Sequence, residues 1–159
     1  MPDSTRQAIC DWLEAANIPF RQVQHEKTLT SEDSARARGE PLRIGGKAML
    51  IKTGETFRLF VLSAELRIDS AAIRERFGTR TLRFARADEL REQTGLVPGS
   101  VPPFGRPILP FELFVDPSIV ANDRIAFNAG SLTHSIILSV EDYLTVAKPV
   151  IFPFAQQPK

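Results

Sequence analysis

The pattern of apolar residues near the start of the chain predicts an amphipathic helix. Its apolar positions recur every three or four residues, the spacing that places side chains on one face of a helix. Ser4 can cap the beginning of this helix, and Asn17 can end it. The residues that share the apolar face are Ala8, Ile9, Trp12, Leu13 and Ala16.

Four later helices are predicted from the residues at their ends. Thr30 and Asp33 have the spacing of a capping box, and Ser139 and Asp142 repeat it. Asp69 is a further helix cap, and three of the segments end at or just before a glycine, namely Gly39, Gly78 and Gly95. The predicted helices cover 30–39, 70–77, 87–94 and 140–146.

Runs of apolar residues predict strands and one clear hairpin. The segments 48–52 and 57–62 flank Thr53-Gly54-Glu55, which can turn the chain back on itself. Because both runs are almost continuously apolar, we expect burial on both faces. Other strands are predicted over 20–24, 81–85, 111–115, 124–127 and 135–138.

The order of these elements predicts a mixed α/β fold. Strands and helices are interleaved without strict alternation, which disfavours a doubly wound parallel sheet. We expect a mixed, curled sheet that forms a partial barrel flanked by helices. The chain of 159 residues shows neither repeats nor a linker, so one domain is predicted over residues 1–159. The tail after Pro149 is expected to fray or to pack as a strap.

Composition narrows the function mainly by exclusion. No apolar run approaches the length of a membrane span and the N-terminus lacks a secretory pattern, so we expect a cytoplasmic protein with no membrane partner. Cys10 is interpreted as buried helix filler, and with only two histidines neither a Cys/His metal site nor a cofactor is expected. Phosphate-loop, dinucleotide, serine-hydrolase and zinc-protease motifs are missing.

The net charge of +1 argues against general binding to nucleic acid such as DNA, but positive charge is concentrated locally. Residues 36–58 hold six basic side chains against two acidic ones, and residues 74–91 hold six against three. A face of this kind suits a local contact with phosphates, although solvated surface charge is the commoner cause of such runs.

Three segments carry the candidate chemistry. From Gly95 to Gly105 the chain is rich in glycine and proline, which predicts either a rigid loop that displays backbone N–H groups or a tight connection. Lys47 follows two glycines at the start of a strand, where it can clamp a phosphate or carbonyl group, or extend into water. Asn128 closes a strand in a turn of small residues, where it can contact a substrate or bond to its own backbone.

Together these segments resemble the prolyl-tRNA synthetase editing domains and their free-standing YbaK-type relatives, a family that hydrolyses wrongly charged aminoacyl-tRNA. The resemblance extends from about residue 20 to residue 144 and rests on the order and spacing of short motifs. These include the His25 loop with the segment 30–35 behind it, Gly46-Lys47-Ala48-Met49-Leu50, Pro98-Gly99-Ser100 and Phe127-Asn128-Ala129-Gly130.

The resemblance implies a pocket for the 3′ end of a mischarged tRNA that carries a small amino acid such as Ala, Ser or Thr. Lys47 matches the family's active-site lysine and would anchor the terminal phosphate or the ester, while the Gly99 and Ser100 amides polarise the carbonyl group. Asn128 would orient water or the substrate amino group. Positioned water and backbone amides would suffice for an activated ester. An aminoacyl-tRNA synthetase is a further implied partner. The implied substrate-binding residues are His25, Gly99, Ser100, Gly105, Ala129 and Gly130.

The chain departs from the family pattern at two places. Ala48 stands where many members have Asn, and Asn128-Ala129 stands where many have His-Pro. The imidazole missing at position 128 leaves an alternative open: a catalytically silent tRNA-end or small-molecule binding module of the same fold.

Overall fold

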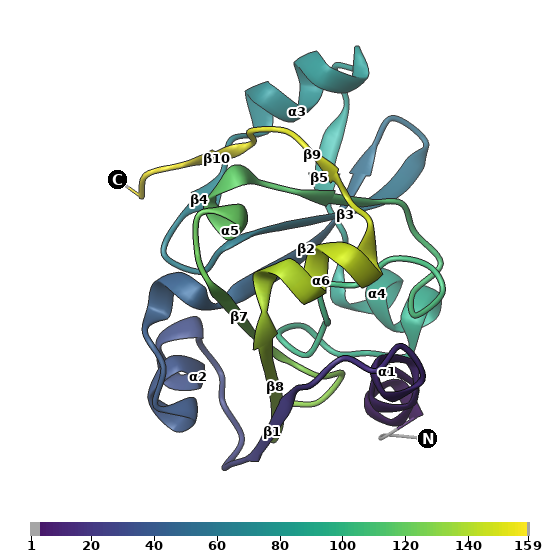
Figure 1. Cartoon of the computed structure of the whole chain (residues 1–159). Coiled ribbons are helices and arrows are strands. Elements are labelled where there is room, and N and C mark those ends of the chain that lie inside the picture. The colour runs from purple at the N-terminus through teal and green to yellow at the C-terminus, as the bar shows by residue number, and fades with distance from the viewer. Residues whose placement is uncertain (1–3, 159) are drawn as a thin grey trace.

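The computed structural model describes residues 4–158 and has the predicted mixed α/β class (Figure 1). Its largest sheet has five strands in the order β5-β2-β3-β6-β9, with antiparallel pairing among the first three and parallel pairing among the last three. The five strands are β5 (Leu82–Phe84), β2 (Gly46–Thr53), β3 (Thr56–Ser63), β6 (Leu113–Val115) and β9 (Val150–Ile151).

Two smaller sheets complete the strand architecture. The antiparallel three-stranded sheet has the order β1-β8-β7, and a two-stranded sheet pairs β10 with β4. A parallel bridge between Gly45 and Ala126 links the two larger sheets, so the predicted curled sheet is divided into separate ladders. These strands are β1 (Arg21–Gln24), β8 (His134–Ser139), β7 (Arg124–Asn128), β10 (Ala155–Gln156) and β4 (Arg67–Ile68).

The helix ends follow the predicted capping chemistry. Thr30 accepts a hydrogen bond from the Asp33 backbone N–H, and Gly39 ends the helix with φ at 71°. Asn17 also has a positive φ, which ends the first helix, but Ser4 lies inside that helix rather than before it. The helices are α1 (Ser4–Ala15), α2 (Ser31–Arg38), α3 (Ser70–Phe77), α4 (Ala87–Thr94), α5 (Pro117–Val120), α6 (Val140–Ala147) and the 3-10 turn Leu42–Ile44.

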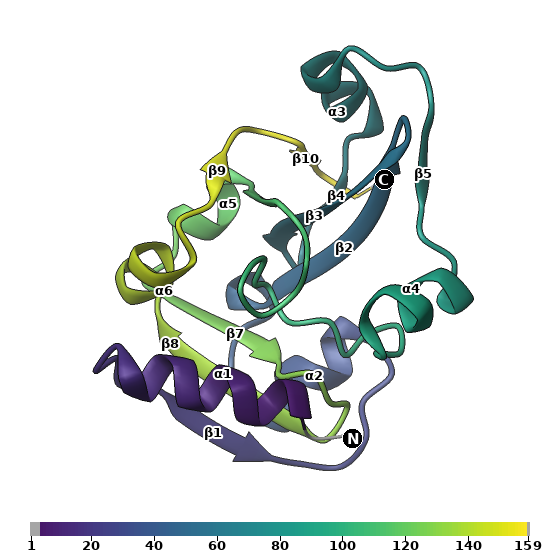
Figure 2. The ribbon, with the colours of Figure 1, turned by 90° about the vertical axis from the view of Figure 1, so that its right-hand side faces the viewer.

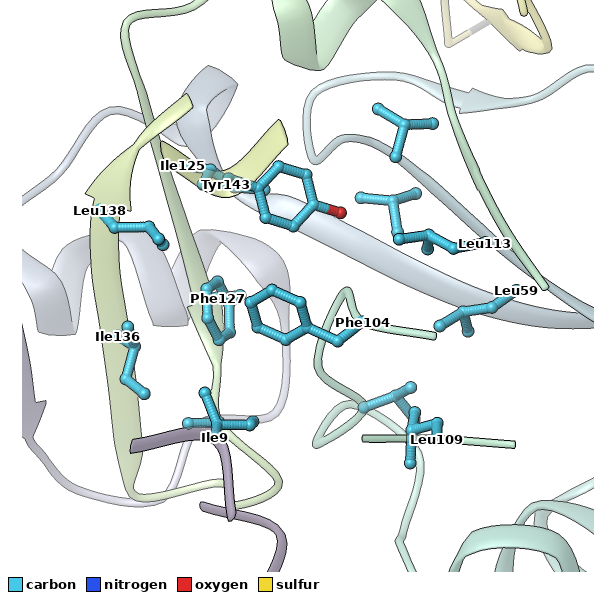
Figure 3. Close-up of a cluster of buried hydrophobic side chains, with 14 of the residues drawn as sticks. Ile9, Leu59, Phe104, Leu109, Leu113, Ile125, Phe127, Ile136, Leu138 and Tyr143 are labelled. Atoms are coloured by element: carbon cyan, nitrogen blue, oxygen red, sulfur yellow. The ribbon is translucent and has the colours of Figure 1, made fainter. Parts of the chain in front are cut away.

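The main core lies between α1, the three-stranded sheet and one face of the five-stranded sheet (Figure 2). Phe104, from the Gly/Pro loop, is fully buried at its centre and meets the Phe127 ring edge-on at 5.3 Å (Figure 3). The buried Tyr143 hydroxyl donates to the Pro103 carbonyl oxygen at 2.6 Å. Burial raises the pKa of Tyr143, so this donor keeps its proton. These contacts fix the loop to the core, as expected for a rigid segment.

A second core on the other face of the five-stranded sheet binds the C-terminal tail. Phe152 and Phe154 are buried there against Phe60, so the tail packs as a strap. Buried Asp116 fixes the strap, because its Oδ1 accepts from the backbone N–H groups of Phe154 at 2.8 Å and Ala155 at 3.0 Å.

The hairpin is less uniformly buried than its sequence predicts. The second half of β3 is buried, whereas residues 46–49 of β2 are only partly buried. β5 pairs with Ile51–Thr53 alone, so the first half of β2 has no strand beside it on that edge among the described residues. This open edge borders the pocket described next.

Candidate active site

A pocket of about 200 Å³ lies between α2, the open edge of β2, the Gly/Pro loop and the end of β7. Lys47 comes from β2, Gly99 from the Gly/Pro loop and Asn128 from the end of β7. Three predicted site residues that are far apart in the sequence therefore line one cavity.

The open edge of β2 also directs backbone groups at this pocket. The Leu50 carbonyl oxygen accepts from the Ala85 N–H at 2.9 Å, which shows that Leu50 faces the β5 side of the strand. Successive residues of a strand alternate in the side to which their N–H and C=O groups point. Ala48, two residues earlier and part of the pocket lining, therefore presents its N–H to the cavity.

Lys47 is a partly buried cation in this pocket. Its Nζ atom donates to the Leu66 carbonyl oxygen at 2.6 Å, and it forms no ion pair within residues 4–158. Burial lowers the pKa of Lys47, and the nearby charge of Glu32 partly opposes that shift. The ammonium group is thus held in place by a neutral acceptor, which leaves its charge available to a ligand.

Arg38 is a second cation of the pocket, and it was not predicted from the sequence. Its Nε donates to the Ser135 Oγ at 2.8 Å, and its Nη2 donates to the Asn128 Oδ1 at 3.1 Å. Burial lowers its pKa to about 10, against the opposing charge of Glu40, so it is charged at neutral pH. One signal was present in the sequence: Ser34, which also lines the pocket, belongs to the segment 30–35 that carries the family resemblance, and Arg38 lies four residues later on the same face of α2.

Asn128 is tied to protein groups on both sides of its amide. Its Oδ1 lies within hydrogen-bond distance of Arg38 and of the Ser135 hydroxyl, and its Nδ2 donates to the Gly99 carbonyl oxygen at 2.8 Å. The side chain therefore connects the end of β7 to the Gly/Pro loop across the pocket wall.

His25 stands behind this wall rather than in the pocket lining. Its Nε2 lies 2.8 Å from the Ser135 Oγ, and its Nδ1 lies 2.8 Å from the Glu26 carbonyl oxygen. The predicted binding residue thus contacts Ser135, which accepts from the pocket-lining Arg38 and lies within hydrogen-bond distance of Asn128.

Ser100, Ala129 and Gly130 lie outside this pocket. The Ser100 N–H donates to the Val97 carbonyl oxygen at 3.1 Å, so the prediction that this amide polarises a substrate carbonyl is wrong for this geometry. The buried Ser100 and Gly130 instead line a second hollow, behind the loop. Ala129 is fully buried, and its N–H donates to the His134 carbonyl oxygen at 3.0 Å.

Gly105 also has a packing role in place of the predicted binding role. A Cβ atom added there would lie 2.5 Å from the Phe111 carbonyl oxygen and 3.1 Å from the Leu113 Cβ. Only glycine therefore fits between the Gly/Pro loop and the start of β6.

Replacing Gly105 with Ala is expected to lower the free energy of unfolding by about 3 kcal/mol, because backbone must shift to admit the methyl group. Urea unfolding of the purified protein measures this loss. Gly78→Ala is the matched control: its φ is +61° with no atom within 4 Å, so we expect a loss of about 1 kcal/mol from backbone strain. Equal losses in the two variants would contradict the packing role of Gly105.

The chain belongs to the aminoacyl-tRNA editing domain family, whose model matches residues 25–146, and this confirms the family predicted from the sequence. It is similar to the multifunctional Ser/Thr-tRNA deacylase ProXp-y of Escherichia coli, with 34% identity over 156 residues that cover 94% of this chain and 92% of that protein. The prolyl-tRNA editing protein ProX of Acetoanaerobium sticklandii is 24% identical over 153 residues, which cover 93% of each chain.

A solved structure has the same fold. It is described as a candidate trans-editing enzyme for prolyl tRNA synthetase, and it aligns with a TM-score of 0.81 at 19% identity, covering 96% of this chain and 98% of its own. Within residues 4–158, no helix is long and apolar enough to cross a membrane. No cluster of three or more His, Cys, Asp or Glu side chains in the same range could hold a metal ion.

Proposed function

We propose that this chain is a trans-editing hydrolase that deacylates mischarged aminoacyl-tRNA carrying a small amino acid. The observation that carries the proposal is the meeting of Lys47, Gly99 and Asn128 in one pocket of an editing-family fold. A cavity of about 200 Å³ suits a small aminoacyl group, and the terminal adenosine would lie at its mouth. Delivery by an aminoacyl-tRNA synthetase and a cytoplasmic location are further parts of the proposal.

The reaction needs little help from side-chain acids and bases, because an aminoacyl ester is already activated. Water adds to the ester carbonyl carbon, the bond from that carbon to the ribose oxygen breaks, and the ribose oxygen leaves with a proton. Lys47 holds the terminal phosphate or the ester by charge. Backbone N–H groups stabilise the oxyanion, and we assign this task to Ala48 and Gly99 in place of Ser100.

Purified protein tests this function directly when it is incubated with Ala-, Ser-, Thr- and Cys-tRNA in parallel. We expect release of at least one of these amino acids well above the rate in buffer. The panel is needed because one methylene group changes selectivity by only about 10- to 200-fold. Release at the buffer rate for every substrate would rule out the enzyme.

The alternative is a catalytically silent module that binds the tRNA end. One observation favours it: the Asn128 amide is held by Arg38 and Gly99, and no imidazole occupies its place. Salt-dependent tRNA binding without deacylation would select this alternative. Binding of a free amino-acid analogue without affinity for tRNA would instead indicate a small-molecule module.

The pH dependence of deacylation is expected to report the charge of Lys47. Because burial lowers the pKa of Lys47, the alkaline limb of kcat should lie below the pKa of a free lysine, about 10.4. Between the pKa of Lys47 in the folded protein and that of a free lysine, the unfolded chain binds more protons than the folded one. The contribution of Lys47 to the free energy of unfolding therefore increases with pH in this interval, so loss of activity there does not result from unfolding caused by this group. Buffer-corrected rates for the protein and for Lys47→Arg measure the limb, which we expect the arginine variant to lack.

A further inference from the structure

The strongest unexplained feature of the pocket is the partly buried guanidinium of Arg38. Neither of its contacts, Ser135 and Asn128, is a carboxylate. The nearby Glu40 instead forms ion pairs with Arg21 at 2.6 Å and Arg124 at 3.0 Å. Even partial burial of a cation without a paired carboxylate costs free energy, because the charge loses part of its hydration. Arg38 is therefore expected to have a role in the pocket wall that offsets this cost.

The hydrogen atoms available in this cluster single out Arg38 as the essential donor. The Glu26 carbonyl oxygen can only accept, so the Nδ1 of a neutral His25 carries the ring proton and its Nε2 accepts. The Ser135 hydroxyl has one hydrogen, which then goes to His25 rather than to Asn128. Arg38 alone has the hydrogens to serve both Ser135 and Asn128.

Arg38 also determines which way the Asn128 amide faces. The Gly99 carbonyl oxygen needs a donor and therefore takes Nδ2, while the charged Nη2 of Arg38 needs an acceptor and takes Oδ1. A flipped amide would place donor against donor and acceptor against acceptor. The two contacts thus select one orientation, and in that orientation Asn128 holds the Gly99 carbonyl.

We propose that Arg38 is a positioning residue, which orients the Asn128 amide and through it holds Gly99 as a fixed wall of the pocket. The expected loss of kcat rests on the proposed function, whereas the fixed position of Gly99 does not. The predicted role of Asn128 in orienting water or the amino group is then confined to its second N–H, because the carboxamide oxygen and the other N–H are already occupied. The Gly99 N–H then meets the ester in a constant position.

Steady-state deacylation by Arg38→Met, Asn128→Ala and the double variant tests this coupling. We expect each single change to lower kcat by about 10- to 100-fold, because small displacements of a positioning group have effects of that size. The double variant should be no slower than the slower single variant. Arg36→Met is the matched control, since Arg36 lies on the same helix with an exposed side chain and pairs with Asp33; its rate should be unchanged. Multiplicative losses, or a rise in KM alone, would overturn the proposal and indicate direct ligand binding by Arg38.

A second variant separates positioning from folding. Asn128→Asp keeps an acceptor for Arg38, now as an ion pair, but loses the donor to Gly99 and sets an oxygen against its carbonyl oxygen. Because these two effects on stability oppose each other, we expect a melting temperature close to that of the parent protein together with the loss of kcat. Hydrogen exchange of the neighbouring Ser100 amide, which donates to the Val97 carbonyl oxygen in the same loop, gives a readout without substrate. It should become faster in both Arg38→Met and Asn128→Asp. Unchanged exchange would overturn the positioning role, whereas altered exchange in a protein with no deacylase activity would reject only the proposed function.

Discussion

Replacing Lys47 with Ala is expected to lower kcat for deacylation by about 100-fold or more, the effect of losing one preorganised group that stabilises a transition state. Lys47 has no carboxylate partner within residues 4–158, and its ammonium group is held only by the Leu66 carbonyl oxygen. The variant therefore loses a charge that serves the ligand rather than the fold. Steady-state release of amino acid from tRNA measures the change.

Two variants control for this expectation. Lys52→Ala removes a lysine from the same strand, one that lies outside the pocket with its Nζ 5.7 Å from the centre of the Phe57 ring, and it should leave kcat unchanged. Lys47→Arg keeps the charge but changes its geometry, so we expect partial activity. Full activity in Lys47→Ala would remove this residue from the mechanism.

Replacing Asp116 with Ala is expected to lower the free energy of unfolding by about 4 kcal/mol, because hydrogen bonds to a buried charged group contribute about 1.5 to 3 kcal/mol each. The carboxylate accepts from three backbone N–H groups, those of Ser118, Phe154 and Ala155. Its removal leaves these donors unpaired and releases the strap from the second core. Urea unfolding of the variant measures the loss.

Asp116→Asn provides the matched comparison for the strap. The amide keeps one oxygen acceptor at nearly the same volume, so we expect a smaller loss than in Asp116→Ala. Partial proteolysis should also cut the C-terminal strap of the alanine variant earlier than that of the parent protein. A change in stability below about 1 kcal/mol in Asp116→Ala, the size of one ordinary hydrogen bond, would contradict the role of this carboxylate.

The parts of the fold that could be predicted are those that local chemistry determines. Thr30 and Gly39 mark the ends of α2 because a cap needs one hydroxyl acceptor and one residue that tolerates a positive φ. The strands β4, β9 and β10 have two residues each, and tertiary pairing forms them. Their sequences carry no period that a local pattern could reveal. α5 is a single turn after Asp116, and it was missed for the same reason.

The candidate site was only partly predictable. Lys47 stood out because two glycines precede it, and the pocket includes it. Glycine and proline indicated a rigid loop but could not show which of its backbone groups face the cavity, and so Ser100 and Gly105 were misplaced. Arg38 was missed because its role depends on Ser135, 97 residues away.

The central claim is that the pocket lined by Lys47, Gly99 and Asn128 receives the aminoacylated 3′ end. Titrating the ¹⁵N-labelled protein with an amide-linked threonyl-adenosine, which cannot be hydrolysed, tests this claim by NMR. We expect saturable shifts of the Ala48 and Gly99 backbone amides and of the Asn128 side-chain amide. Shifts confined to Gly130 and Ser131 in the second hollow, or no saturable shift at all, would contradict the account.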